Sequence, residues 1–172
     1  MSDEWPMPAG PLTGGCQCGA VRFRAEALHH NPHVCYCRMC QKATGNLFAA
    51  LVGVRLEHLT WARGTPARFR SSEHVDRGFC PNCGTPLFYQ HDESDRVGMS
   101  IGAFDEPHRI SLRWQMGSEG KHPSMFDLGE VESLGTTEIA DGEEATTAIR
   151  LSNNQHPDHD TVDWTPTRST QP

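Results

Sequence analysis

"CPNCG", residues 80–84, is the stretch that most constrains the fold, because two cysteines separated by two residues can turn both thiolates toward one metal ion. Gly84 permits the tight backbone that follows such a knuckle. A second pair stands in "CQC", residues 16–18, where alternate side chains of an extended chain point to one side. If the two pairs lie side by side, one structural zinc ion would join parts of the chain more than 60 residues apart. Its ligands would be Cys16, Cys18, Cys80 and Cys83.

The remaining three cysteines stand close together in "CYCRMC", residues 35–40. Structural zinc sites use four protein ligands, whereas catalytic sites keep three and leave one position for water or substrate. Because the chain has seven cysteines, they divide into four and three. The sequence therefore predicts two zinc ions per chain, the second in an open catalytic site at Cys35, Cys37 and Cys40.

Other interpretations of the cysteines stay open at this stage. His33, the histidine nearest the triplet in sequence, could complete a second closed structural zinc site. An iron–sulfur cluster is another alternative, although the spacing matches no familiar pattern of four cysteines. Disulfides would leave one thiol over, and cysteines one residue apart fit disulfide geometry poorly. Four further histidines lie in polar stretches and are expected at the solvated surface: His29, His30, His156 and His159.

The composition indicates a single domain rich in turns. At 172 residues the chain is long enough to bury a core, yet its apolar content of 36% and its mean hydropathy of -0.57 are low. Its 16 glycines and 12 prolines favour many turns over long helices. A structural zinc site contributes about 10 kcal/mol of folding free energy in small domains, and such a contribution would stabilise so modest a core.

Short strands bounded by Gly, Pro, Asp or Ser dominate the first two thirds of the chain. In residues 19–25, alternation places Val21 and Phe23 on a buried face and Arg22 and Arg24 on the other. A turn or helical start is expected at residues 39–45. Spacing of this kind predicts a mainly β domain of antiparallel sheets. The further expected strands are residues 47–54, 56–62, 67–72, 86–91, 96–104 and 109–116.

The character of the sequence changes beyond Met116, where a long loop is expected. One short helix is predicted in residues 141–154, with Asp141 as its N-cap and Glu144 completing a capping box. Its apolar face is thin, so it should pack lightly. We therefore predict a zinc-binding domain at residues 1–133 and an acidic C-terminal extension at 134–172. That extension would end in a mobile tail unless Trp164 docks onto the body.

Charge is unevenly distributed along the chain. Residues 1–118 hold 12 Lys and Arg against 11 Asp and Glu, whereas residues 119–172 hold 3 against 11. This lacks the basic stripe of a nucleic-acid-binding protein. The longest apolar run, residues 47–54, is far shorter than the roughly 20 residues of a membrane span. The N-terminus has no basic or apolar stretch typical of a secretory signal, so a cytoplasmic location is expected, while the oligomeric state stays open.

Four motifs in order resemble the glutathione-dependent formaldehyde-activating enzyme family, which includes the centromere protein V relatives. They are "GGCQCGAVRF", "CYCRMCQKATG", "SSEHVDRGFCPNCGTPLF" and "SIGAFDEP", and they cover residues 14–107. The resemblance implies a β-tent fold with two zinc sites grouped as above. It also implies carbon–sulfur lyase activity, the reversible joining of formaldehyde and glutathione as S-hydroxymethylglutathione. Two stretches depart from many relatives: Tyr36 replaces a histidine, and "HPSMFDL", residues 122–128, stands where a Pro-Trp is common.

An open zinc site suggests chemistry on a small thiol, glutathione being the expected example. A substrate thiol bound to zinc loses its proton near neutral pH, so the substrate itself would supply the nucleophile. Arg38, Lys42 and Arg77 are candidate partners for an anionic ligand, but each is more simply interpreted as a solvated surface residue and stays outside the predicted site. The competing hypothesis is a binding module in which both metals are structural and the acidic C-terminal part contacts a protein partner.

Overall fold

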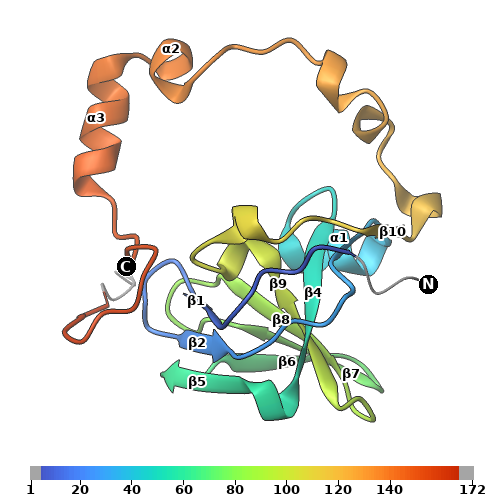
Figure 1. The fold of residues 1–172 in the computed structure, drawn as a ribbon. Coiled ribbons are helices and arrows are strands. Elements are labelled where there is room, and N and C mark those ends of the chain that lie inside the picture. Colours follow the sequence, from blue (N-terminus) through green and yellow to red (C-terminus); the bar gives the residue numbers. More distant parts are fainter. Residues whose placement is uncertain (1–4, 167–172) are drawn as a thin grey trace.

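The computed structural model describes residues 5–166 and contains two β-sheets that face each other (Figure 1). The smaller sheet has the strand order β1-β2-β5, and both of its strand pairs are antiparallel. Its strands are β1 (Leu12–Gly15), β2 (Arg22–Ala25) and β5 (Leu59–Arg63).

The larger sheet has seven strands in the order β10-β3-β4-β9-β8-β7-β6. It confirms the predicted mainly β fold with one difference, since β10 pairs with β3 in parallel while the other pairs are antiparallel. Its strands are β3 (His33–Cys35), β4 (Ala49–Arg55), β6 (Ala67–Ser72), β7 (Val75–Phe79), β8 (Pro86–His91), β9 (Arg96–Ser100) and β10 (Trp114–Met116).

The hydrophobic core lies between the two sheets. Phe23 of β2 is fully buried and meets the rings of Phe104 and Trp61 edge-on, with centroid distances of 5.0 and 6.0 Å. From the larger sheet, Val52 and Val54 of β4 and Met99 of β9 are likewise 0% exposed. Strand β4 lies between β3 and β9. Its continuous apolar run suits this place, because side chains on both of its faces are buried.

Several predicted elements match the structure closely. Strands β6 and β8 have the predicted bounds, and the expected helical start is α1 (Arg38–Thr44), which ends at Gly45 in the left-handed region with φ 64°. The expected strand at 96–104 is shorter, because its second half is the 3-10 turn η2 (Ile101–Ala103). The strand expected at 56–62 likewise begins with the 3-10 turn η1 (Leu56–His58). Strands β1, β3 and β7 were not predicted.

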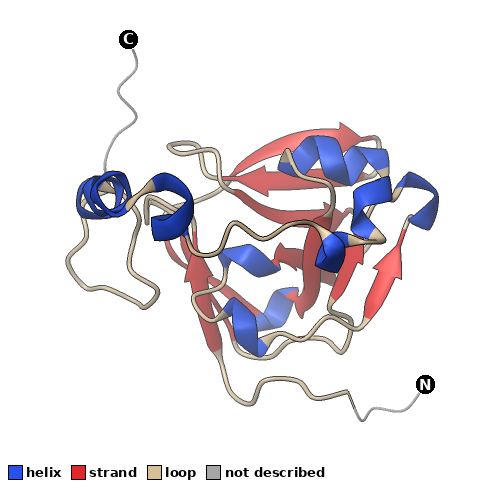
Figure 2. Cartoon of the chain, turned by 90° about the horizontal axis from the view of Figure 1, so that it is seen from above, coloured by secondary structure: helices blue, strands red, loops and turns tan. Residues whose placement is uncertain are grey.

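Beyond β10 the chain leaves the sheets in an arc of short helical turns and returns near its C-terminus (Figures 1 and 2). The prediction of one helix capped by Asp141 is wrong. Asp141 ends a first helix, and Gly142, with φ 88°, is the N-cap of the second. Helix packing is light, since Ile149 and Leu151 are 66% and 83% exposed. The 3-10 turn η3 (Pro107–Arg109) precedes β10. The elements beyond β10 are η4 (Ser118–Gly120), η5 (Pro123–Met125), η6 (Leu128–Glu130), α2 (Thr137–Asp141) and α3 (Glu143–Ser152).

Residues 155–164 pack onto the body beside β2. Trp164 Nε1 donates a hydrogen bond to the carbonyl oxygen of Cys18 at 2.8 Å, which is the docking contact that the sequence left open. The expectation that His156 is solvated is wrong, because this side chain is 3% exposed and lies against Gly19 and Trp164. The expected mobile tail extends to residues 167–172, outside the described residues, and the domain boundary at 133/134 stays a prediction.

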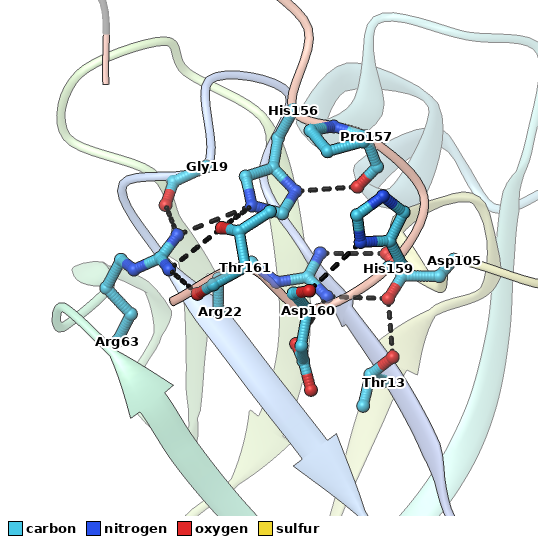
Figure 3. Close-up of polar contacts among 10 residues, drawn as sticks. All are labelled: Thr13, Gly19, Arg22, Arg63, Asp105, His156, Pro157, His159, Asp160 and Thr161. Carbon is cyan, nitrogen blue, oxygen red and sulfur yellow. Dashed lines mark hydrogen bonds and ion pairs between the residues drawn. The ribbon is translucent and has the colours of Figure 1, made fainter. Parts of the chain in front are cut away.

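Arg22 corrects the alternation predicted for β2. It was expected on the solvent face, yet its side chain is 4% exposed. Its guanidinium donates two parallel hydrogen bonds to Asp105, at 2.8 and 2.6 Å, and a third to Asp160 at 2.7 Å (Figure 3). Residues 155–164 therefore cover the second face of β2 at Arg22, whereas Arg24 on that face stays exposed. Within residues 5–166, no helix is long and apolar enough to cross a membrane.

Candidate metal sites

The first cysteine group joins two turns that lie far apart in sequence. Cys16 and Cys18 lie in the turn between β1 and β2, and Cys80 and Cys83 lie in the turn between β7 and β8. All four Sγ atoms lie within 4.8 Å of one another. We call this set the four-cysteine group. The sequence predicted this long-range contact, and the structure brings the two pairs together.

The spacing of these sulfur atoms suits a tetrahedral metal ion. Four thiolates at about 2.3 Å from a zinc ion would be separated by about 3.8 Å along each tetrahedral edge. The Sγ atoms of Cys16 and Cys18 are 3.6 Å apart, and those of Cys18 and Cys80 are 3.9 Å apart. All seven cysteines are free thiols, so the disulfide alternative is not supported. The donor set therefore fits a bound metal ion.

The four thiols ionise unequally. Burial raises the pKa values of Cys16, Cys18 and Cys80, the last to about 11. Burial also acts to raise the pKa of Cys83, but hydrogen bonds from the hydroxyl and the backbone amide of Thr85, together with those from Cys18, outweigh it and hold that pKa at about 6. A metal ion would displace the protons from all four, since its positive charge favours the thiolate form.

Thr85 is a functional residue that sequence reasoning missed. Its hydroxyl oxygen accepts a hydrogen bond from the Gln17 amide at 3.1 Å and lies 3.2 Å from Cys83 Sγ. It therefore connects the two halves of the four-cysteine group. In the sequence, the signal that could have identified Thr85 is its position two residues after Cys83, because a hydroxyl so near a metal ligand can donate a hydrogen bond to the thiolate.

The second cysteine group lies where β3 meets α1. Cys35 ends β3, Cys37 is the N-cap of α1 and Cys40 lies within the helix. Their three Sγ atoms lie within 4.8 Å of one another, and within residues 5–166 no His, Asp, Glu or further Cys joins them. His33, the alternative fourth ligand, instead donates from Nδ1 to the Asn31 carbonyl at 2.7 Å. We call this set the three-cysteine group.

Backbone amides of helix α1 lower the pKa of one thiol of this group. Burial acts to raise the pKa of Cys37, but hydrogen bonds from the backbone amides of Cys40 and Met39 and from the neighbouring thiols together hold it below its usual value. Burial raises the pKa of Cys35 to about 12. The Cys37 thiol therefore ionises more readily than the Cys35 thiol, which needs a metal ion to become a thiolate.

Strand β10 and the glycine that follows it pack against the three-cysteine group. Met116 is the register partner of Cys35, and its carbonyl accepts a hydrogen bond from the Tyr36 amide at 2.9 Å. The ring of Tyr36 is buried against Phe48, at a centroid distance of 6.1 Å. Tyr36 is therefore part of the packing next to the site. Gly117, with φ 65°, lies against the backbone of Cys37.

A cavity of about 520 Å³ lies beside the three-cysteine group, between α1 and the face formed by β4, β6, β7 and β8. Its wall is mainly apolar, with Met39, Leu51, Phe69 and Phe88 among its members, and among residues 5–166 neither an acidic residue nor a cysteine lines it. Three cations line it: Arg38, Lys42 and Arg77. The cavity therefore suits a small ligand that carries negative charge.

The class of protein follows from the fold and the two thiol groups: a mainly β domain whose cysteines could hold metal ions. A family model described as glutathione-dependent formaldehyde-activating enzyme matches residues 11–116, and the chain belongs to this family. Membership supports enzymatic activity of the formaldehyde-activating or lyase type.

Individual relatives agree with this assignment. A putative glutathione-dependent formaldehyde-activating enzyme of Halomonas elongata is 51% identical over 35 residues, which span 20% of this chain and only 22% of that protein. An uncharacterized lyase of Schizosaccharomyces pombe is 22% identical over 126 residues, 73% of this chain and 90% of that protein. The crystal structure of a Rhodobacter sphaeroides protein shares the fold, with a TM-score of 0.50 and 22% identity, covering 60% of this chain and 99% of that one.

Proposed function

We propose that the chain is a zinc-dependent carbon–sulfur lyase acting on the adduct of a thiol and a small aldehyde, such as S-hydroxymethylglutathione. The observation that carries this proposal is the convergence of Cys35, Cys37 and Cys40 beside a cationic cavity, apart from the four-cysteine group. Three protein ligands with room for a fourth are typical of catalytic zinc, and four protein ligands are typical of structural zinc.

A zinc ion held by the three-cysteine group would supply a Lewis-acidic position that takes the sulfur of the substrate as a thiolate. The apolar wall of the cavity would limit access of water to the reacting atoms, while Arg38, Lys42 and Arg77 would attract the carboxylates of a glutathione-like substrate. In cleavage, the carbon–sulfur bond breaks and its electron pair moves to sulfur. The hydroxyl oxygen loses its proton to solvent and becomes the carbonyl oxygen of the aldehyde.

The four-cysteine group would hold a second zinc ion with a structural role. It joins the turn before β2 to the turn before β8, and three of its four cysteines are buried. Coordination there would contribute about 10 kcal/mol to folding in the manner of small zinc domains. Loss of this ion should unfold the chain, whereas loss of the ion at the three-cysteine group should leave the fold in place.

Thiol titration of the cobalt-substituted protein tests the proposal. We expect glutathione to change the visible bands of cobalt at the three-cysteine group, because a fourth sulfur enters its coordination sphere. S-methylglutathione has the same charge but no ionisable thiol, so it serves as the control and should leave the bands unchanged. A spectrum that stays the same with both compounds would contradict the proposal.

Two cysteine variants separate the roles of the groups. Cys37→Ser should abolish cleavage of S-hydroxymethylglutathione while the far-ultraviolet circular dichroism stays that of the wild type. Cys80→Ser removes a buried ligand of the four-cysteine group and should unfold the chain. If both variants unfold equally, the three-cysteine group is structural and the proposed catalysis is wrong.

A further inference from the structure

Arg77 of β7 connects the cavity to the three-cysteine group. Its side chain lines the cavity, and its Nη2 lies 3.5 Å from Cys40 Sγ, within hydrogen-bonding distance for a sulfur acceptor. The other two cations of the cavity wall differ from it. Arg38 and Lys42 are exposed on α1, and Arg38 donates to Gln41 instead of to a thiol. Arg77 is thus the cavity cation with a direct contact to a proposed zinc ligand.

The Arg77 guanidinium is held in place on two further sides. Its Nε donates to the Ser71 hydroxyl at 3.1 Å, and its Cζ lies 5.1 Å from the centroid of the Tyr89 ring, the cross-strand partner of Arg77. Within residues 5–166, no carboxylate forms a salt bridge with this guanidinium. Its positive charge is therefore directed at the thiol group and not cancelled by a neighbouring acid.

Charge balance explains why a cation is useful at this position. Three thiolates on one zinc ion leave one net negative charge, and entry of a substrate thiolate adds a second. Two negative charges at this partly buried group, next to a largely apolar cavity, are unfavourable unless a fixed cation lies close by. A guanidinium on Cys40 would offset one of these charges and withdraw electron density from its sulfur. A neutral fourth ligand gains much less from this contact.

We propose that Arg77 is a positioning residue that acts through Cys40 and makes the open coordination position selective for an anionic sulfur ligand over a neutral one. This inference rests on the proposed function, because it requires a metal ion at the three-cysteine group. Beyond the proposed function, Arg77 alone would set the preference of the site for a charged ligand over a neutral one.

The test uses the full chain loaded with cobalt and two small probes that need no other part of the cavity. 2-Mercaptoethanol binds as a thiolate, whereas imidazole binds as a neutral ligand. Arg77→Gln should weaken 2-mercaptoethanol binding by about tenfold or more, as expected for loss of a charge-assisted hydrogen bond, and change imidazole binding less than about twofold. Arg77→Lys keeps the charge without the fork of donors and should recover part of the thiol affinity.

A matched control is available one strand away. Arg68 of β6 also lies over an aromatic ring, with its Cζ 5.0 Å from the centroid of Phe88, but it hydrogen-bonds to Gln90 and Asp76. Arg68→Gln makes the same change of charge and should leave both affinities within about twofold of wild type. Ser71→Ala removes the acceptor of the Arg77 Nε without changing the charge and should weaken thiol binding by a smaller factor. This variant keeps the inference testable if Arg77→Gln does not fold.

The outcomes separate this inference from the proposed function. If the wild-type protein binds neither probe, the proposed function fails and the inference fails with it. If wild type binds 2-mercaptoethanol and Arg77→Gln binds it equally well, the inference alone is wrong. Equal weakening of both probes would assign Arg77 a merely structural role and would also overturn the inference.

Discussion

The indole Nε1 of Trp164 donates to the carbonyl oxygen of Cys18 at 2.8 Å, so the C-terminal segment touches the four-cysteine group directly. The Trp164 ring also meets the His156 ring edge-on at a centroid distance of 4.7 Å. Both side chains lie over Gly19, where any Cβ would clash with them. The last part of the described chain thus covers the turn that carries Cys16 and Cys18.

Trp164→Ala should destabilise the metal-loaded protein by about 1–3 kcal/mol, because it removes a hydrogen bond and aromatic packing over the turn. Urea denaturation measures the loss, and chelator-induced release of metal from the four-cysteine group should become faster. Val162→Ala, at a side chain that is 97% exposed, is the control and should have little effect. Identical release rates for the two variants would show that residues 155–164 do not protect this group.

Asp105→Asn should cost about 2–3 kcal/mol, because it leaves the buried guanidinium of Arg22 with only the half-exposed Asp160 as a charged partner. Asp105 is 7% exposed in its side chain, whereas Asp95 is 61% exposed and pairs with Arg55 at the surface. Asp95→Asn is therefore the control, with an expected change below about 1 kcal/mol. Equal losses in the two variants would contradict this account of the buried pair.

The same pair predicts a pH dependence. Burial acts to raise the pKa of Asp105, but hydrogen bonds from Arg22 and Thr13 and the charge of Arg22 outweigh it and hold that pKa below its usual value. The carboxylate therefore contributes stability that is fully present above its unfolded pKa of about 3.9 and is lost as pH falls through the lower native pKa. The difference in unfolding free energy between wild type and Asp105→Asn should be equal at pH 7 and pH 5 and smaller at about pH 3.5, measured with excess zinc.

Thr85→Val should make the four-cysteine group release its metal at higher pH. The hydroxyl helps to hold the pKa of Cys83 at about 6, so its removal raises that pKa and protons compete better with the metal. We expect the release midpoint to move upward by about half a unit to one unit, followed by absorbance of the cobalt-loaded protein. Thr60→Val, at an exposed position of β5, should not move it. A midpoint that is the same in both variants would show that Thr85 does not act on Cys83.

The cysteine groups were predictable because the spacing within each motif is a local signal and the number of cysteines is read directly from the sequence. A pair such as Cys80 and Cys83 can face one ion whatever surrounds it, and counting then leaves three cysteines for the second group. Strands β6 and β8 were also predicted from local signals, since each lies between turn residues. The contact between Arg77 and Cys40 is different, because no motif and no residue count links these two residues, and it depends on how β7 passes α1.

The burial of Arg22 and His156 was not predictable from local sequence. Alternation treats a strand as having one covered face, but at Arg22 the second face of β2 is covered by a segment more than 130 residues further along the chain. His156 lies in a run of polar residues, and only the absence of a side chain at Gly19 makes room for its ring. The burial of both side chains depends on a segment that is distant in sequence, so neither could be predicted from its neighbours along the chain.

Gly117→Ala should disturb the three-cysteine group and leave the four-cysteine group unchanged. A Cβ at this position would lie 2.7 Å from the backbone nitrogen of Cys37, so the backbone that carries this ligand must move. Gly45→Ala is a matched control, since Gly45 has nearly the same φ, 64° against 65°, but no atom of the described residues 5–166 lies within 4 Å of its Cβ position. Both variants share a backbone cost of about 1–2 kcal/mol, so any difference between them reports the contact with Cys37. We expect Gly117→Ala to lower cobalt affinity at the three-cysteine group by about tenfold relative to Gly45→Ala, measured by competition with a chelator; equal affinities would mean that residues 116–120 do not position Cys37.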